Sequence, residues 1–239
     1  MSLSLINRRR LIMSSNIISD EYVQDGLVFY LDGTDKQQSG NVVWTDKIGG
    51  ITFTNGGLAE ELPNGFRFNG SGGSILIGNR VLNTPDKNNY TIEIVCCSRI
   101  SYDTWKPLFV LNNWNTFNYL GAAVMYNGES NYIHSFKFIA RNETPDLNCY
   151  AMPHNELVTL SSQYNTPIYV NKNLVTQVAA TNTSAFSSLG NAYVGGRIHG
   201  TTSTIFIGDI HAIRVYDRRL TQNEILNNQR IDMLKYNIS

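Results

Sequence analysis

The chain has 239 residues, enough for one large β domain, and 42% of them are hydrophobic while 16% are charged. Its 19 basic and 19 acidic residues balance, which argues against a body built to bind nucleic acid, because phosphate contacts need a basic surface. No apolar run approaches a membrane span, and the apolar stretch after the N-terminal arginines is too short for the core of a secretory signal. The composition is compatible with a sugar or a protein as the binding partner.

Residues 1–19 are predicted to form a basic N-terminal arm outside the folded domain. Arg8, Arg9 and Arg10 stand in a segment without Asp or Glu, and the other residues hold 16 of the 19 basic side chains against all 19 acidic ones. A basic and apolar segment at the end of a domain is typical of a docking peptide. The alternative is a disordered leader without a role.

Residues 20–239 are predicted to form one antiparallel β-sandwich, because short β-type segments alternate with Gly, Asn, Asp, Ser and Thr. Asn-Gly dipeptides, which tolerate positive φ, mark several of the turns. The predicted strands are Leu27–Leu31, Gly65–Phe68, Ser74–Ile77, Tyr90–Cys97, Leu108–Leu111, Gly121–Tyr126, Ser135–Ala140, Leu157–Ser161, Ile168–Val170, Ala192–Val194, Thr204–Ile207 and Ile210–Tyr216.

The strand predicted around Thr91–Cys97 indicates how its sheet is covered. Ile92, Ile94 and Cys96 share one face, whereas Thr91, Glu93 and Val95 share the other. This alternation favours a sheet with one buried face and one partly wet face.

The next segment interleaves aromatic rings with amides and is the predicted ligand-binding region. Sugars stack their apolar face on an aromatic ring while amides hydrogen-bond their hydroxyls. The alternative is that these rings belong to the core and the asparagines form turns. The candidate residues are Trp105, Asn112, Asn113, Trp114, Asn115, Phe117 and Tyr119.

One helix is predicted, over residues 222–236. Thr221 and Glu224 have the spacing of a capping box, in which each side chain binds the backbone N–H of the other residue. The residues that follow at near-helical spacing give a half-apolar face that should dock on the sandwich. They are Ile225, Leu226, Gln229, Met233 and Tyr236.

Several segments resemble the laminin G-like domains of the concanavalin A-like class, from about Tyr22 to the last residue. They are Gly26–Asp32, Trp44 with Asp46, Phe66–Gly70, Ile168–Asn171 and, most fully, Phe206–Ile225. The resemblance implies an all-β antiparallel jelly-roll sandwich with one C-terminal helix. These segments specify a fold rather than a function.

The resemblance also raises the question of calcium. Many similar domains carry an acidic residue where this chain has His211, and often another at Ala212, and some of those acids bind calcium. An imidazole and a methyl group do not replace carboxylate oxygens. Asp209, Asp46 and Asp32 form a candidate set if the fold brings them together; the alternative is that Asp209 and Asp46 form turns. No other cofactor is expected.

Catalysis is not expected. Members of the fold class that cleave β-glucans place three carboxylates on one strand as Glu-x-Asp-x-x-Glu, and this chain has no Glu-x-Asp. It also lacks Gly-x-Ser-x-Gly and His-Glu-x-x-His.

The arm, together with Tyr22–Leu27, resembles the beginning of structural proteins of phages of gut bacteria that carry laminin G-like domains. This implies a virion decoration or fibre protein whose sandwich meets a glycan or host surface. Its arm is then expected to bind other virion proteins or sister chains, with no nucleic-acid or membrane partner. The alternatives are a bacterial glycan-binding adhesion module at the cell surface and a diverged glycoside hydrolase.

Overall fold

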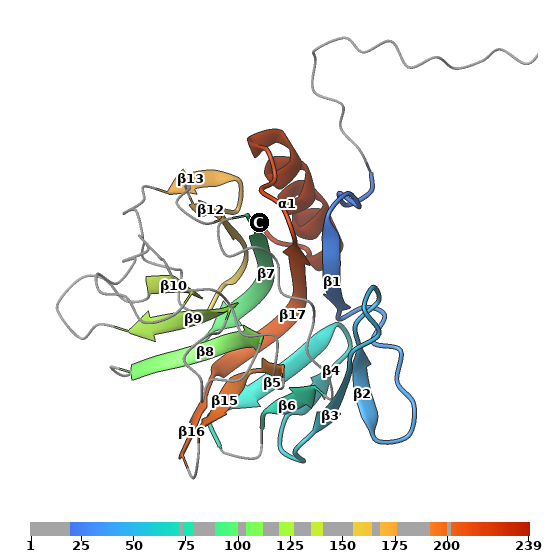
Figure 1. Ribbon diagram of the computed structural model, residues 1–239. Helices are drawn as coiled ribbons and strands as arrows, with labels where there is room; N and C mark the ends of the chain where they lie inside the picture. The colour runs from blue at the N-terminus through green and yellow to red at the C-terminus, as the bar shows by residue number, and fades with distance from the viewer. Residues whose placement is uncertain are drawn as a thin grey trace, which may run out of the picture.

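The computed structural model describes residues 20–71, 74–78, 89–99, 104–111, 120–126, 135–140, 155–163, 168–175, 192–199 and 202–239. These residues form two large antiparallel sheets, a short hairpin and one helix (Figure 1). The elements are β1 (Leu27–Asp32), β2 (Val42–Thr45), β3 (Thr52–Asn55), β4 (Glu60–Leu62), β5 (Gly65–Asn69), β6 (Leu76–Gly78), β7 (Thr91–Ser98), β8 (Thr104–Leu111), β9 (Leu120–Tyr126), β10 (Ser135–Ala140), β11 (Leu157–Gln163), β12 (Ile168–Val170), β13 (Asn173–Val175), β14 (Tyr193–Val194), β15 (Gly196–His199), β16 (Thr202–Ile205), β17 (Ile207–Tyr216) and α1 (Gln222–Tyr236).

The first sheet, called sheet A, has the order β13-β12-β11-β7-β17-β5-β4, and β1 also pairs with β17. The ten-residue strand β17 is central to sheet A because it pairs with three other strands. Its first half pairs with β5, its second half pairs with β1, and β7 runs along its other side. A register shift between Ile210 and Ala212 in the pairing with β7 adds His211 as an extra residue of β17.

The second sheet, called sheet B, has the order β10-β9-β8-β14-β6-β3-β2. The hydrophobic core lies between the two sheets and is rich in aromatic side chains. Phe29 of sheet A stacks on Phe109 of sheet B with ring centroids 5.1 Å apart, and it meets Phe53 edge-on. Fully buried Trp44 packs against Phe66 and donates its indole N–H to a backbone carbonyl. These pairs join the two layers.

Helix α1 covers the outer face of sheet A. The predicted capping box is present at Thr221 and Glu224, and the helix spans the predicted 222–236. The helix ends where Asn237 takes a left-handed conformation. Its buried residues are Ile225, Asn228, Gln229, Asp232 and Tyr236, so the docked face is more polar than the predicted one.

The prediction that one face of β7 is partly exposed to water is therefore wrong. All eight residues of Thr91–Ser98 are buried, because α1 lies over the face that carries Thr91, Glu93 and Val95. Helix α1, which lies near the C-terminus, shields this face from water. No residue pattern within β7 itself predicts this cover.

Each predicted strand overlaps an observed strand, and Ser135–Ala140 and Ile168–Val170 have the predicted bounds. The short strands β2, β3, β4, β13 and β15 were not predicted. Within the part of the chain that the structure describes, no helix has the length and apolarity needed to span a membrane.

Candidate functional site

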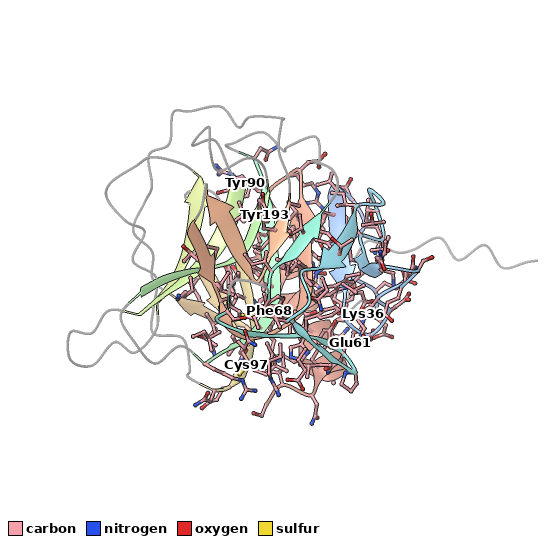
Figure 2. The ribbon with its side chains drawn as sticks, turned by 90° about the horizontal axis from the view of Figure 1, so that it is seen from below. Lys36, Glu61, Phe68, Tyr90, Cys97 and Tyr193 are labelled. Carbon is pink, nitrogen blue, oxygen red and sulfur yellow. The ribbon has the colours of Figure 1, made fainter. Side chains whose placement is uncertain are left out.

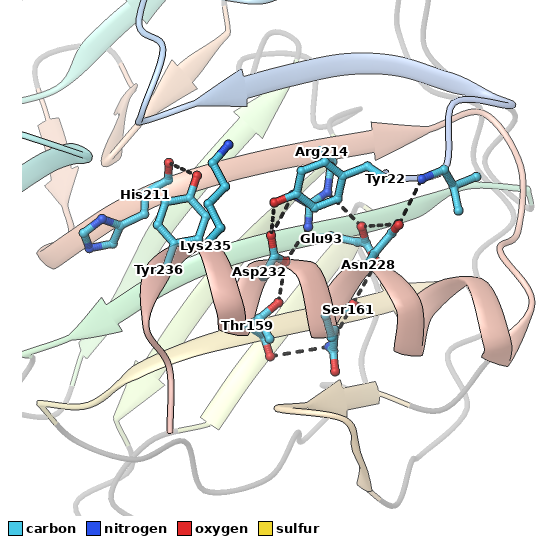
Figure 3. A network of polar contacts seen from close by, with 12 residues as sticks. Tyr22, Glu93, Thr159, Ser161, His211, Arg214, Asn228, Asp232, Lys235 and Tyr236 are labelled. Carbon is cyan, nitrogen blue, oxygen red and sulfur yellow. Dashed lines mark hydrogen bonds and ion pairs between the residues drawn. The ribbon is translucent and has the colours of Figure 1, made fainter. Parts of the chain in front are cut away.

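A buried network of charges lies between α1 and sheet A (Figure 3). Arg214 of β17 is fully buried, and its guanidinium donates from Nη1 and Nη2 to both carboxylate oxygens of Asp232 on α1. Its Nε donates to Glu93 Oε2 of β7 at 2.9 Å. One side chain thus bonds two strands to the helix.

The remaining oxygen atoms of the network also have partners. Asn228 donates to Glu93 Oε2 at 2.9 Å, and Ser161 donates to Glu93 Oε1 at 3.1 Å. Thr159 donates to Asp232 Oδ2 at 2.8 Å. Buried charges are tolerated when they are paired and hydrogen-bonded in this way.

Burial acts differently on the acid and the base of this network. It raises the pKa of Glu93, against the opposing effect of the Arg214 charge. Burial acts to lower the pKa of Arg214, but the charges of Asp232 and Glu93 outweigh it and raise that pKa well above its usual value. Arg214 therefore stays charged, and the network holds α1 on the sheet.

Residues 20–24, called the strap, cover the network from the N-terminal side. The Tyr22 ring lies over the guanidinium of Arg214, 4.1 Å from its central carbon, and the Tyr22 hydroxyl donates to Asp232 Oδ1 at 2.9 Å. The backbone N–H of Val23 donates to Asn228 Oδ1 at 3.0 Å. The strap thereby ties the start of the domain to the helix near its end.

Two of the three predicted calcium ligands have other roles. Asp32 accepts hydrogen bonds from Lys235 at 2.8 Å to each oxygen; although burial acts to raise its pKa, these bonds hold it well below the usual value. Asp46 accepts the backbone N–H groups of Tyr30 and Gly49, both at 2.8 Å. Asp46 is thus a turn former, the alternative interpretation of the sequence.

The third, Asp209, is held by two arginines. It accepts from Arg67 Nε at 2.8 Å and from Arg99 Nη2 at 2.7 Å. The nearby His211 donates from Nδ1 to the carbonyl of Asn64 at 2.8 Å, since a carbonyl only accepts. Among the described residues, no three His, Cys, Asp or Glu side chains form a group that could hold a metal ion.

Of the predicted ligand-binding residues, Trp105 is the one that the structure describes, and it belongs to the other sheet. Trp105 lies in β8, where its backbone pairs with Met125 of β9. Asn112, Asn113, Trp114, Asn115, Phe117 and Tyr119 lie outside the described residues, as do Arg8, Arg9 and Arg10 of the arm. Residues 112–119 join β8 to β9, whose ends pair at Leu111 and Leu120. The candidate segment therefore connects two neighbouring strands of sheet B.

The outer face of sheet B adds an aromatic residue that sequence reasoning missed. Tyr193, labelled in Figure 2, pairs with Ile77 on one side and Val110 on the other. Its neighbour Val194 points into the core, so the half-buried Tyr193 lies on the opposite face. The sequence signal for this position was its place between Ala192 and Val194, two apolar residues that are buried in the core.

Comparisons with known proteins support the fold. No protein-family model and no curated protein matches the chain. Among solved structures, Trypanosoma rangeli sialidase in complex with sialic acid has 18% sequence identity and a TM-score of 0.60, over 90% of this chain and 34% of that chain. The botulinum neurotoxin type G receptor binding domain has 14% identity and a TM-score of 0.53, over 87% of this chain and 52% of that chain.

This chain thus spans about a third of the sialidase and about half of the toxin domain. At such identities the similarity shows the fold alone. The architecture is a concanavalin A-like sandwich: two antiparallel sheets with one C-terminal helix, as the sequence resemblance implied.

Proposed function

We propose that this chain is a non-catalytic carbohydrate-binding protein that binds its ligand on the side of sheet B. The observation that carries the proposal is that the outer face of sheet A is already covered. Helix α1, the buried network and the strap occupy the outer face of sheet A, so a ligand surface on that side would require the helix to leave.

The chemistry of the sheet B side supports a sugar. Trp105 and Tyr193 belong to its strands, and the segment that follows β8 supplies Trp114 between two asparagines. Aromatic faces with adjacent amides are the groups that bind pyranose rings. The similar structures include a sialidase with sialic acid and a receptor binding domain, which favours a glycan ligand for this fold.

The test is a glycan array followed by calorimetry with the best glycan. Trp114→Ala should bind that glycan about tenfold more weakly, a change of about 1.4 kcal/mol, and Tyr193→Ala tests the neighbouring face. Leu174→Ala, on β13 of sheet A, alters an exposed leucine, is the control, and should bind as the unaltered chain does. A folded Trp114→Ala protein with unchanged affinity contradicts the placement of the site.

The same experiment tests the absence of catalysis. After long incubation the glycan should be recovered intact. Release of a reducing sugar would favour the alternative of a diverged glycoside hydrolase.

We further propose that the protein is a decoration or fibre protein of a phage virion, attached through Arg8, Arg9 and Arg10 of its arm. The charge separation between arm and body supports this, as does the resemblance of the first residues to phage structural proteins. Purified particles should co-sediment with the full chain and not with a chain lacking residues 1–19. Equal co-sedimentation refutes the anchor, and binding of both chains to bacterial cells alone favours the surface-adhesion alternative.

A further inference from the structure

The strap fixes the place where the arm leaves the domain. Besides the contacts of Tyr22 and Val23, the backbone carbonyl of Glu21 accepts from Asn227 Nδ2 at 3.2 Å. Asp20 lies 3.4 Å from a guanidinium nitrogen of Arg230. Both partners belong to α1, so the arm begins beside the outer side of this helix.

That side of α1 carries an exposed apolar residue. Leu234 is 71% exposed, and it follows Arg230 by one helical turn, so both lie on the same side of the helix. Ile231 beside it is only partly buried. A single exposed leucine is common on protein surfaces, but this one adjoins the exit of a segment that itself contains Leu11, Ile12 and Met13.

We propose that the outer side of α1, formed by Asn227, Arg230, Ile231 and Leu234, is the docking surface for the arm of a second copy of this chain. The inference rests on the proposed assembly role of the arm and names its first partner. The arm then exchanges between copies, and each α1 receives the arm of its neighbour.

Charge complementarity favours a second copy as the partner. The arm holds three arginines and no acid, whereas the remaining residues hold 16 basic against 19 acidic side chains. Acidic groups stand at the exit itself: the side chains of Asp20 and Asp25 are 97% and 86% exposed, and each pairs with one arginine of its own chain, Arg230 and Arg218, while remaining open to a second partner. Arg8–Arg10 of a neighbour can meet these acids while the apolar residues next to them cover Leu234.

The length of the arm permits this exchange. Met13 precedes Asp20 by seven residues, which span up to about 25 Å when extended. Helix α1 has 15 residues and is therefore about 22 Å long. An arm that leaves one helix thus reaches across the helix of a copy packed against it.

Native mass spectrometry of the full chain over a range of concentrations tests the proposal. The full chain should form a dimer or larger closed species, and the chain lacking residues 1–19 should be monomeric. Leu234→Asp should raise the dissociation constant at least about tenfold, because it places a charge in the apolar contact. Leu174→Asp on β13, which alters a leucine that is 58% exposed, is the matched control and should change it less than about twofold.

A mixing experiment separates exchange from an arm that folds back on its own helix. The arm-deleted chain keeps an intact α1, and the Leu234→Asp chain keeps an intact arm, so a mixture of the two should form a heterodimer that neither forms alone. Failure to form it, a monomeric full chain, or equal effects of the two leucine variants each overturns the proposal. Glycan binding by Leu234→Asp is measured in parallel, so a failure of docking is distinguished from a failure of the proposed function.

Discussion

Replacing Asp232 by Ala should lower the free energy of unfolding by about 3–5 kcal/mol. The carboxylate accepts both Nη donors of Arg214 and the hydroxyl groups of Tyr22 and Thr159. Its removal leaves Arg214 buried with Glu93 as its remaining ion partner, and breaking a buried pair on one side costs about this much. Each hydroxyl that loses its acceptor adds to the cost.

Urea unfolding measures this loss. With a urea dependence of about 3 kcal/mol per M, the midpoint should fall by about 1–2 M. Asp20→Ala removes a highly exposed acid that pairs with the same helix and should cost no more than about 1 kcal/mol. If Asp232→Ala is as mild as Asp20→Ala, the network does not hold α1 on the sheet.

Further variants test three local features: the helix cap, a buried histidine and a glycine packed against a ring. Thr221→Ala should cost about 1 kcal/mol by removing the helix cap, and Thr221→Ser should restore it. Burial lowers the pKa of His211, so the unfolded chain takes up this proton first; stability should fall as pH drops below about 6.5, and His211→Gln should flatten that part of the profile. Gly195→Ala should lower the melting temperature strongly, because its Cβ would lie 2.0 Å from the ring of Phe68. Gly50→Ala is the control: its φ of 68° is close to the 77° of Gly195, so the backbone strain is shared, but its Cβ meets no neighbouring atom.

A different result in each of these experiments would contradict the physical reason given for it. Equal urea midpoints for the Ala and Ser variants at Thr221 would deny the cap a role. An unchanged pH profile without the imidazole would mean that His211 does not cause the fall in this pH range, because a carboxylate with a lowered pKa, such as Asp209, loses its contribution only below about pH 4. Similar melting temperatures for the two glycine variants would mean that the Phe68 ring moves aside.

The fold was largely predictable from sequence, because local signals specify most of its parts. Strand periodicity located the long strands, and the spacing of Thr221 and Glu224 placed the helix start at the correct residue. The strands that escaped, such as β13 and β15, have three or four residues, and so few residues show little periodicity.

The buried face of α1 shows what local patterns omit. The predicted face counted Leu226 and Met233, whereas the structure buries Asn228 and Asp232 instead. Polar residues are buried there because Glu93 and Arg214 supply partners, and Glu93 is 135 residues away from Asn228 in sequence. A partner that distant leaves no trace in the spacing of the helix residues themselves.

For the candidate site, the sequence predicted which residue types take part but not where they lie in the fold. The aromatic and amide residues of 112–119 were identified from chemistry, and the topology then assigned their segment to the β8–β9 connection of sheet B. Tyr193 reaches the same sheet from more than 70 residues later through strand pairing alone.

The central place of β17 has a consequence for synthesis on the ribosome. The partners of this strand, β1, β5 and β7, are all made long before it. Until residues 207–216 have been synthesised, β7 and β5 have no strand between them. The segments of β1, β5 and β7 therefore lack the strand with which all three pair. Sheet A therefore closes late, by contacts between distant parts of the chain, which is slow and leaves exposed edges meanwhile. A nascent chain of this protein should depend on chaperones until residues 207–239 are complete.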